Sequence, residues 1–197
     1  MDTVDFGPAT QRLGDLIARV PDGDLGQPTP CPAYTLGDLI EHVGTMALAF
    51  AAAAAKDSGP LTSQQPSGDA SRLSPDWRTR IPRDLAALAQ AWREPGAWTG
   101  MTRIASMDAP AEMVGATAAD ELVVHGWDVA RATGQPYEAE PEMVAVARAF
   151  LDAFATPDAP AGPDVAFGPA RLLPDSEPPL DRLVAMAGRD PAWSADC

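Results

Sequence analysis

The chain has 197 residues, which is enough for one substantial hydrophobic core but short for two full domains, so we expect a single domain over residues 1–197. Its 28 acidic and 14 basic residues give a net charge of −14, which repels phosphate backbones and anionic membrane surfaces and argues against nucleic acid or a membrane as partner. The N-terminus lacks a secretion signal and the longest apolar run, residues 43–55, is too short to span a bilayer, so we expect a cytoplasmic protein.

The first predicted element is an amphipathic helix over about residues 8–20, because apolar residues recur there at intervals of three and four up to Pro21. A connection rich in glycine and proline follows. It ends in residues 29–35, where two prolines favour an extended approach to the next helix.

A second helix is predicted to begin after Thr35 and to end near Lys56. Thr35 can cap this helix, and Asp38 at the third helical position can complete a capping box. His42 then lies about two turns inside the helix. Its orientation would be set by packing rather than by a loop, as a preorganised ligand requires.

The middle of the chain is less regular. Residues 57–71 are polar and rich in turn-forming residues, which predicts a loop. Apolar residues from Trp77 to Trp92 predict a third helix, in which Pro82 would be best tolerated near the first turn. Residues 98–107 are predicted to be an extended connection or a short strand.

The second half of the chain predicts further helices. Asp108 followed by Ala-Pro favours the start of a long fourth helix that ends at Gly134 and Pro136. A fifth helix is predicted over residues 140–156. The tail, residues 157–197, is rich in proline with a short helical piece over 180–187, and we expect it to pack on a bundle formed by about residues 8–156. The predicted fold class is all-α.

Glu121 and His125 lie one helical turn apart, so both side chains leave the same face of the fourth helix. The chain has only one other histidine, His42. Two packed helices could therefore supply two imidazoles and one carboxylate, a ligand set that catalytic zinc uses with one position left open. The alternative is a structural one, because an isolated pair at this spacing is more often a helix-surface hydrogen bond or a buried imidazole satisfied by a neighbour.

Two carboxylates near these candidate ligands each have two interpretations. Asp128 follows His125 by three residues and Asp38 precedes His42 by four, so either could orient an imidazole from its far side. Alternatively, Asp38 serves only the capping box, and Asp128 pairs with Arg131 on the helix surface.

The two cysteines, Cys31 and Cys197, do not make a disulfide scaffold in a chain of this size, and we expect reduced thiols. Cys31 lies just before a helix N-terminus, where the helix dipole can lower a thiol pKa and make it reactive or metal-binding. Packing is the commoner role for such a residue, because free cysteines are usually buried.

Three stretches of the sequence resemble the actinobacterial DinB-like proteins grouped with mycothiol-dependent maleylpyruvate isomerases. Residues 29–42 resemble the opening motif of these proteins, residues 120–136 their second motif, and residues 183–191 their usual ending. The resemblance covers essentially the whole chain and is strongest to the short, metal-binding branch. It implies a DinB-type four-helix bundle with an extra C-terminal helix and an extended tail.

The resemblance also implies a function. In such proteins a divalent metal, usually zinc, is held at the positions of His42, Glu121 and His125, and these donors would also accept nickel or iron. In characterised relatives the metal binds the sulfur of a low-molecular-weight thiol, mycothiol in actinobacteria, which attacks an electrophile. A metal-dependent thiol S-transferase or isomerase acting on a small electrophile is therefore expected. The alternative is a non-catalytic helical bundle that binds a metal or a small ligand.

The sequence departs from its relatives in two ways. Tyr34 stands where the first motif commonly has tryptophan, which should affect packing more than chemistry. The maleylpyruvate isomerases also carry a larger C-terminal domain that contributes to their active site, whereas this chain has only some forty residues after the fifth helix, so that particular isomerisation is not expected. A homodimer is compatible with a helical bundle, although no residue indicates its interface.

Overall fold

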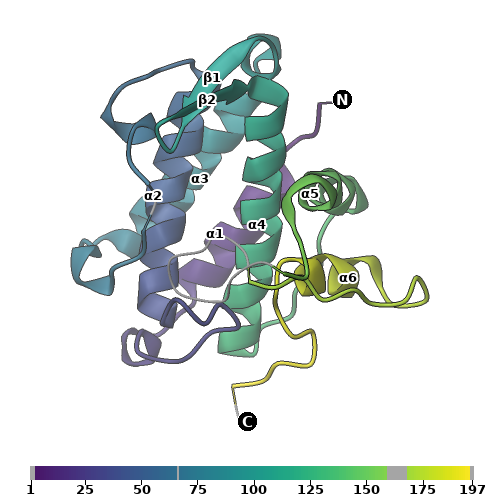
Figure 1. Ribbon diagram of the computed structural model, residues 1–197. Helices are drawn as coiled ribbons and strands as arrows, with labels where there is room; N and C mark the ends of the chain where they lie inside the picture. The colour runs from purple at the N-terminus through teal and green to yellow at the C-terminus, as the bar shows by residue number, and fades with distance from the viewer. Residues whose placement is uncertain (1–2, 66, 159–167, 196–197) are drawn as a thin grey trace.

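A computed structural model describes residues 3–65, 67–158 and 168–195, and these form a bundle of helices with one small β-hairpin (Figure 1). The helices are α1 (Gly7–Ala18), α2 (Leu36–Ala54), α3 (Trp77–Trp92), α4 (Ala111–Thr133), α5 (Pro141–Phe154) and α6 (Pro179–Met186), and the strands are β1 (Met101–Ile104) and β2 (Met107–Pro110). Cys197 and part of the predicted tail lie outside the described residues. The predicted all-α class is confirmed.

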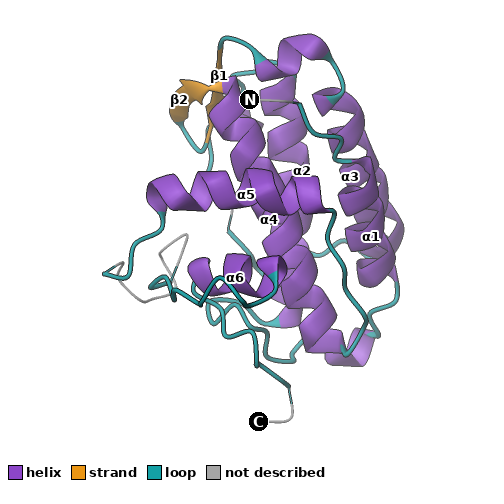
Figure 2. Cartoon of the chain, turned by 90° about the vertical axis from the view of Figure 1, so that its right-hand side faces the viewer, coloured by secondary structure: helices purple, strands orange, loops and turns teal. Residues whose placement is uncertain are grey.

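The four long helices α1 to α4 make the bundle, in which α1 and α2 each pack against both α3 and α4. The fifth helix, α5, packs on α4 on the side away from α2, and α6 lies beside α5 (Figures 1 and 2). Apolar residues spaced three and four apart on each helix point inward and form one continuous core. Its largest fully buried side chains include Phe6, Leu13, Ile17, Leu39, Met46, Leu85, Trp92 and Leu122.

The start of α2 forms as predicted. The Thr35 hydroxyl accepts a hydrogen bond from the N–H of Asp38, and the Asp38 carboxylate accepts one from the N–H of Thr35, which completes the capping box. Among the described residues, α2 is the one helix with the length and composition of a membrane span, and 78% of that stretch is buried inside the protein. The helix thus runs through the core and carries His42 within it.

The predicted start of the long fourth helix is wrong by three residues. Asp108 belongs to strand β2, which pairs antiparallel with β1, and the Asp108 carboxylate binds the Arg103 guanidinium across the hairpin at 2.8 Å. The two connecting residues, Ala105 and Ser106, both have positive φ, as the tight turns of hairpins require. Helix α4 therefore begins only after Pro110, although it ends at Gly134 as predicted.

The position of Pro82 also differs from the prediction. It lies in the second turn of α3, which starts at Trp77, and not in the first turn. There it packs against Gly14 of α1, where a β-carbon would lie 3.1 Å from the proline ring. The absence of a side chain at Gly14 thus leaves room for the proline ring between α1 and α3.

Candidate metal centre

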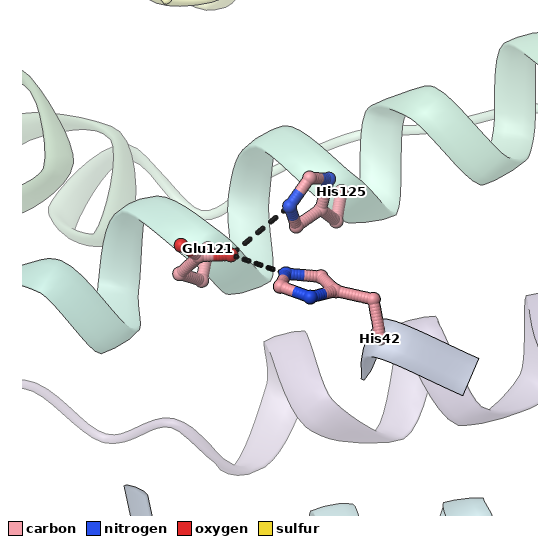
Figure 3. Close-up of side chains that lie close together, drawn as sticks. All are labelled: His42, Glu121 and His125. Carbon is pink, nitrogen blue, oxygen red and sulfur yellow. Dashed lines mark hydrogen bonds and ion pairs between the residues drawn. The ribbon is translucent and has the colours of Figure 1, made fainter. Parts of the chain in front are cut away.

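The structure brings His42, Glu121 and His125 together in the interface between α2 and α4 (Figure 3). One oxygen of Glu121, Oε2, lies 3.0 Å from Nε2 of His125 on its own helix and 3.3 Å from Nε2 of His42 on the other helix. One donor atom from each of the three residues lies within 4.8 Å of the other two. Helix periodicity places Glu121 and His125 on one face, and packing of α2 on α4 supplies His42.

The three side chains are not equally covered. The side chains of His42 and His125 are 8% and 9% exposed, whereas that of Glu121 is 22% exposed. The half-buried ring of Tyr34 lies against the His42 ring, with 5.2 Å between ring centroids. Glu121 is therefore the most solvent-accessible of the three side chains, since the two imidazoles are enclosed by protein.

His125 is held from its far side by a buried carboxylate. Its Nδ1 donates a hydrogen bond to Oδ2 of Asp128 at 3.0 Å, and Asp128 is fully buried. The Arg189 guanidinium donates two further hydrogen bonds to the same carboxylate, of 2.9 and 3.3 Å. The predicted alternative, an Asp128–Arg131 pair, is wrong, because Arg131 instead donates to the carbonyl of Pro191.

Asp38 does not support His42 in the same way. Its carboxylate is taken up by the capping box and by the N–H of Ala70 at 2.8 Å. Nδ1 of His42 is buried and has no hydrogen-bond partner among the described residues. The capping interpretation of Asp38 is therefore the one that the contacts favour, and the two imidazoles differ in how firmly they are oriented.

Cys31 is a buried free thiol, in agreement with a packing role. The loop around it is ordered by Thr29, whose hydroxyl accepts a hydrogen bond from the N–H of Cys31 and lies 2.9 Å from the Tyr34 carbonyl. This loop places Tyr34 beside the centre, where its ring packs against the ring of His42.

Charges in the centre are strongly coupled. Burial alone would raise the pKa of Glu121, but the neighbouring His125 and His42 outweigh burial and hold it far below its ordinary value. Burial alone would lower the pKa of His125, but the carboxylates of Glu121 and Asp128 outweigh burial and raise it well above its ordinary value. In the metal-free protein Glu121 is thus an anion and His125 a cation at neutral pH.

Asp120, the residue before Glu121, behaves differently from its neighbour. Burial, reinforced by the charge of Glu121, raises its pKa well above the ordinary value, a shift that favours the protonated form. Its Oδ1 is buried without a hydrogen-bond partner in the described part of the chain. The shift in the pKa of Asp120 is thus opposite in direction to that of Glu121.

The donor set fits a divalent cation. Two imidazole nitrogens and a carboxylate are the protein ligands of catalytic zinc sites that keep a fourth position open. A metal-bound histidine usually donates its second N–H to a carboxylate, which fixes the ring and its tautomer, and the His125–Asp128 hydrogen bond has this form. The sequence alone predicted no role for Arg189, although this residue lies within residues 183–191, one of the three stretches that carry the family resemblance.

Comparison with known proteins gives a consistent match. A family model described as the mycothiol maleylpyruvate isomerase N-terminal domain matches residues 6–130, a segment that contains the three candidate ligands and Asp128 but not Arg189. Two relatives, named uncharacterized proteins of Mycobacterium tuberculosis strains CDC 1551 / Oshkosh and H37Rv, are each 29% identical over 186 residues, which is 92% of this chain and 96% of the relative.

The fold also matches solved structures. The mycothiol-dependent maleylpyruvate isomerase and a histidine-to-alanine mutant of it both superpose with a TM-score of 0.57, at 21% and 20% sequence identity. In both cases the match covers 76% of this chain and 66% of the isomerase chain. At this level of identity the similarity concerns the fold alone.

Proposed function

The chain belongs to the family of mycothiol maleylpyruvate isomerase N-terminal domains, and from this membership we propose that it binds a divalent metal and uses a low-molecular-weight thiol to transform a small electrophile by S-transfer or isomerisation. The single observation that carries the proposal is the convergence of His42, Glu121 and His125 from two helices. Zinc is the metal that we expect, while nickel or iron would accept the same donors. Mycothiol is the thiol that the family description favours.

Each side chain has a part in this proposal. His42 and His125 would hold the ion through their Nε2 atoms and Glu121 through its carboxylate, while Asp128 keeps the His125 ring in place. When bound there, a divalent ion would act as a Lewis acid and keep a coordinated thiol deprotonated. The burial of the imidazoles and the neighbouring Tyr34 ring would limit water around the ion, and Glu121 is the ligand most exposed to solvent.

We also propose that residues 1–197 form one domain. The support is the burial of Arg189, from the C-terminal tail, against Asp128 in the C-terminal part of α4. A tail that formed a separate unit would not place a charged side chain inside the bundle.

A second candidate function is a bundle that binds a metal or a small ligand without catalysis. The observation behind it is the extent of the structural match, which covers 66% of the solved isomerase chain and leaves the rest of that chain without a counterpart. The whole isomerase's substrate and reaction therefore do not transfer to this chain on the strength of a shared bundle.

The two candidates are separated by a thiol-consumption assay. Zinc-loaded protein is mixed with mycothiol and a panel of small electrophiles that includes maleylpyruvate, and loss of free thiol or isomerisation of substrate is followed. We expect turnover that stops when the metal is removed with a chelator and returns when zinc is added back. Absence of turnover with every electrophile, despite bound zinc, would favour the binding function, and turnover that survives metal removal would contradict the metal-dependent one.

Metal loading at neutral pH should release protons. The raised pKa of His125 means that the metal-free protein carries an imidazolium, whose ion pairs are fully present below the ordinary histidine pKa and are lost as pH rises through the raised value. A cation that takes Nε2 must displace this proton. Titration of weakly buffered metal-free protein with zinc chloride, followed with a pH indicator, should show release of about one proton per chain. Full metal binding with no proton release would show that His125 is neutral or is not a ligand.

A further inference from the structure

We propose that Arg189 is a positioning residue for the metal centre, acting on His125 through Asp128, and that the C-terminal tail is therefore a functional part of the centre. The inference rests on the proposed binding of a metal by His42, Glu121 and His125. It goes further because Arg189 lies 59 residues beyond the end of the segment that the family model matches, at residue 130.

The contacts form a continuous chain from the tail to the candidate ligand. Two nitrogens of the Arg189 guanidinium, Nε and Nη2, donate to the two oxygens of Asp128, and Oδ2 of Asp128 also accepts the hydrogen bond from Nδ1 of His125. The third guanidinium nitrogen, Nη1, donates to the carbonyl of Ala187 at 2.7 Å. Both oxygens of the Asp128 carboxylate are thus hydrogen-bonded to the Arg189 guanidinium, which is itself held by the Ala187 carbonyl.

Burial prevents water from replacing the hydrogen bonds between Arg189 and Asp128. Asp128 is 0% exposed and Arg189 is 5% exposed, so neither side chain can exchange its partner for water. Without the two guanidinium donors, the buried carboxylate would have unsatisfied oxygens and could rotate toward another donor, which would weaken its hold on His125. Lysine cannot reproduce the two parallel hydrogen bonds, because only the planar guanidinium offers two donors at the spacing of a carboxylate.

Arg189 reaches Asp128 from the C-terminal tail, which lies outside the bundle of α1 to α4. The chain turns at Gly188, whose φ is +84°, and the N–H of Arg189 donates to the carbonyl of Val184 in the last turn of α6. Because Nδ1 of His42 has no comparable partner in the described structure, the influence of the tail falls on His125 alone. The tail therefore controls one of the two imidazoles.

The test measures metal binding in the full-length protein. Arg189→Lys and Arg189→Met are compared with Arg171→Lys, a control in the same tail whose salt bridge with Asp190 is exposed on both sides. Zinc affinity is measured by competition with a chelating dye, and the visible absorption of cobalt-loaded protein reports the ligand geometry. We expect both Arg189 variants to bind zinc about 10- to 100-fold more weakly and to show an altered cobalt spectrum, with Arg171→Lys unchanged.

A double-variant comparison separates positioning from general destabilisation. If Arg189 acts through Asp128, then Arg189→Lys should have little further effect on zinc affinity in an Asp128→Asn background, whereas a general loss of stability would add to it. Wild-type affinity and an unchanged cobalt spectrum in folded Arg189→Lys protein would overturn the inference and leave the proposed function standing. Failure of the wild-type protein to bind zinc or cobalt would overturn both.

Discussion

Replacing His42 or His125 with alanine should lower the zinc content of the purified protein from about one equivalent per chain to below about a tenth. Each substitution removes one of three donor atoms that lie within 4.8 Å of each other, and a carboxylate with a single imidazole is a weak site. Elemental analysis after gel filtration, in buffer free of chelator, measures this directly. Loss of metal from both variants is the expected result because the two histidines come from different helices and have no other shared role.

Thr117→Ala is the matched control for these variants. Thr117 lies one turn before Glu121 on the same face of α4, and its hydroxyl donates only to the carbonyl of Met113 among the contacts described. Its removal should leave the zinc content unchanged. Full zinc content in both histidine variants would mean that the ion binds elsewhere, and the cluster would then be a buried hydrogen-bonded network.

Asp128→Ala should destabilise the metal-free protein by about 3–5 kcal/mol, because it leaves the buried Arg189 guanidinium without its counter-charge. The His125 ring loses its partner in the same step. Since the total free energy of unfolding of a domain is about 5–15 kcal/mol, this single change would remove a large share of it. Urea unfolding with a chelator present measures the effect without a contribution from bound metal.

The control for this stability experiment is Asp152→Ala. Asp152 also accepts from an arginine, Arg148, one turn away on α5, but both side chains are in contact with solvent. Exposed pairs of this kind contribute only about 0.3–0.5 kcal/mol. A loss of stability in Asp128→Ala no larger than in Asp152→Ala would show that the buried pair is not a structural link between tail and bundle.

Much of the fold follows from local sequence. The capping box at Thr35 and the glycine stop at Gly134 depend on residues within one turn of each other, so their patterns predict the helix ends they form. Asp108 is different, because its local sequence is compatible both with the start of a helix and with a strand of a hairpin. The cross-strand partner Arg103 and the tight turn between the strands decide the outcome, and neither belongs to the helix pattern.

In the candidate centre, too, some contacts follow from local sequence and others depend on tertiary packing. Helix periodicity alone puts Glu121 and His125 on one face, whereas the approach of His42 depends on how α2 packs on α4. Asp128 lies three residues from both His125 and Arg131, so spacing cannot choose between them. In the structure Asp128 pairs with Arg189 and not with Arg131. Arg189 lies 61 residues further along the chain, where no local pattern connects it to Asp128.

The most direct test of this account is X-ray diffraction from crystals of the zinc-loaded protein, measured on both sides of the zinc absorption edge. We expect one anomalous peak between α2 and α4, about 2.0–2.2 Å from Nε2 of His42, Nε2 of His125 and a carboxylate oxygen of Glu121. A zinc-loaded crystal with no peak at that position, or with a peak that one of the two imidazoles does not reach, would contradict it.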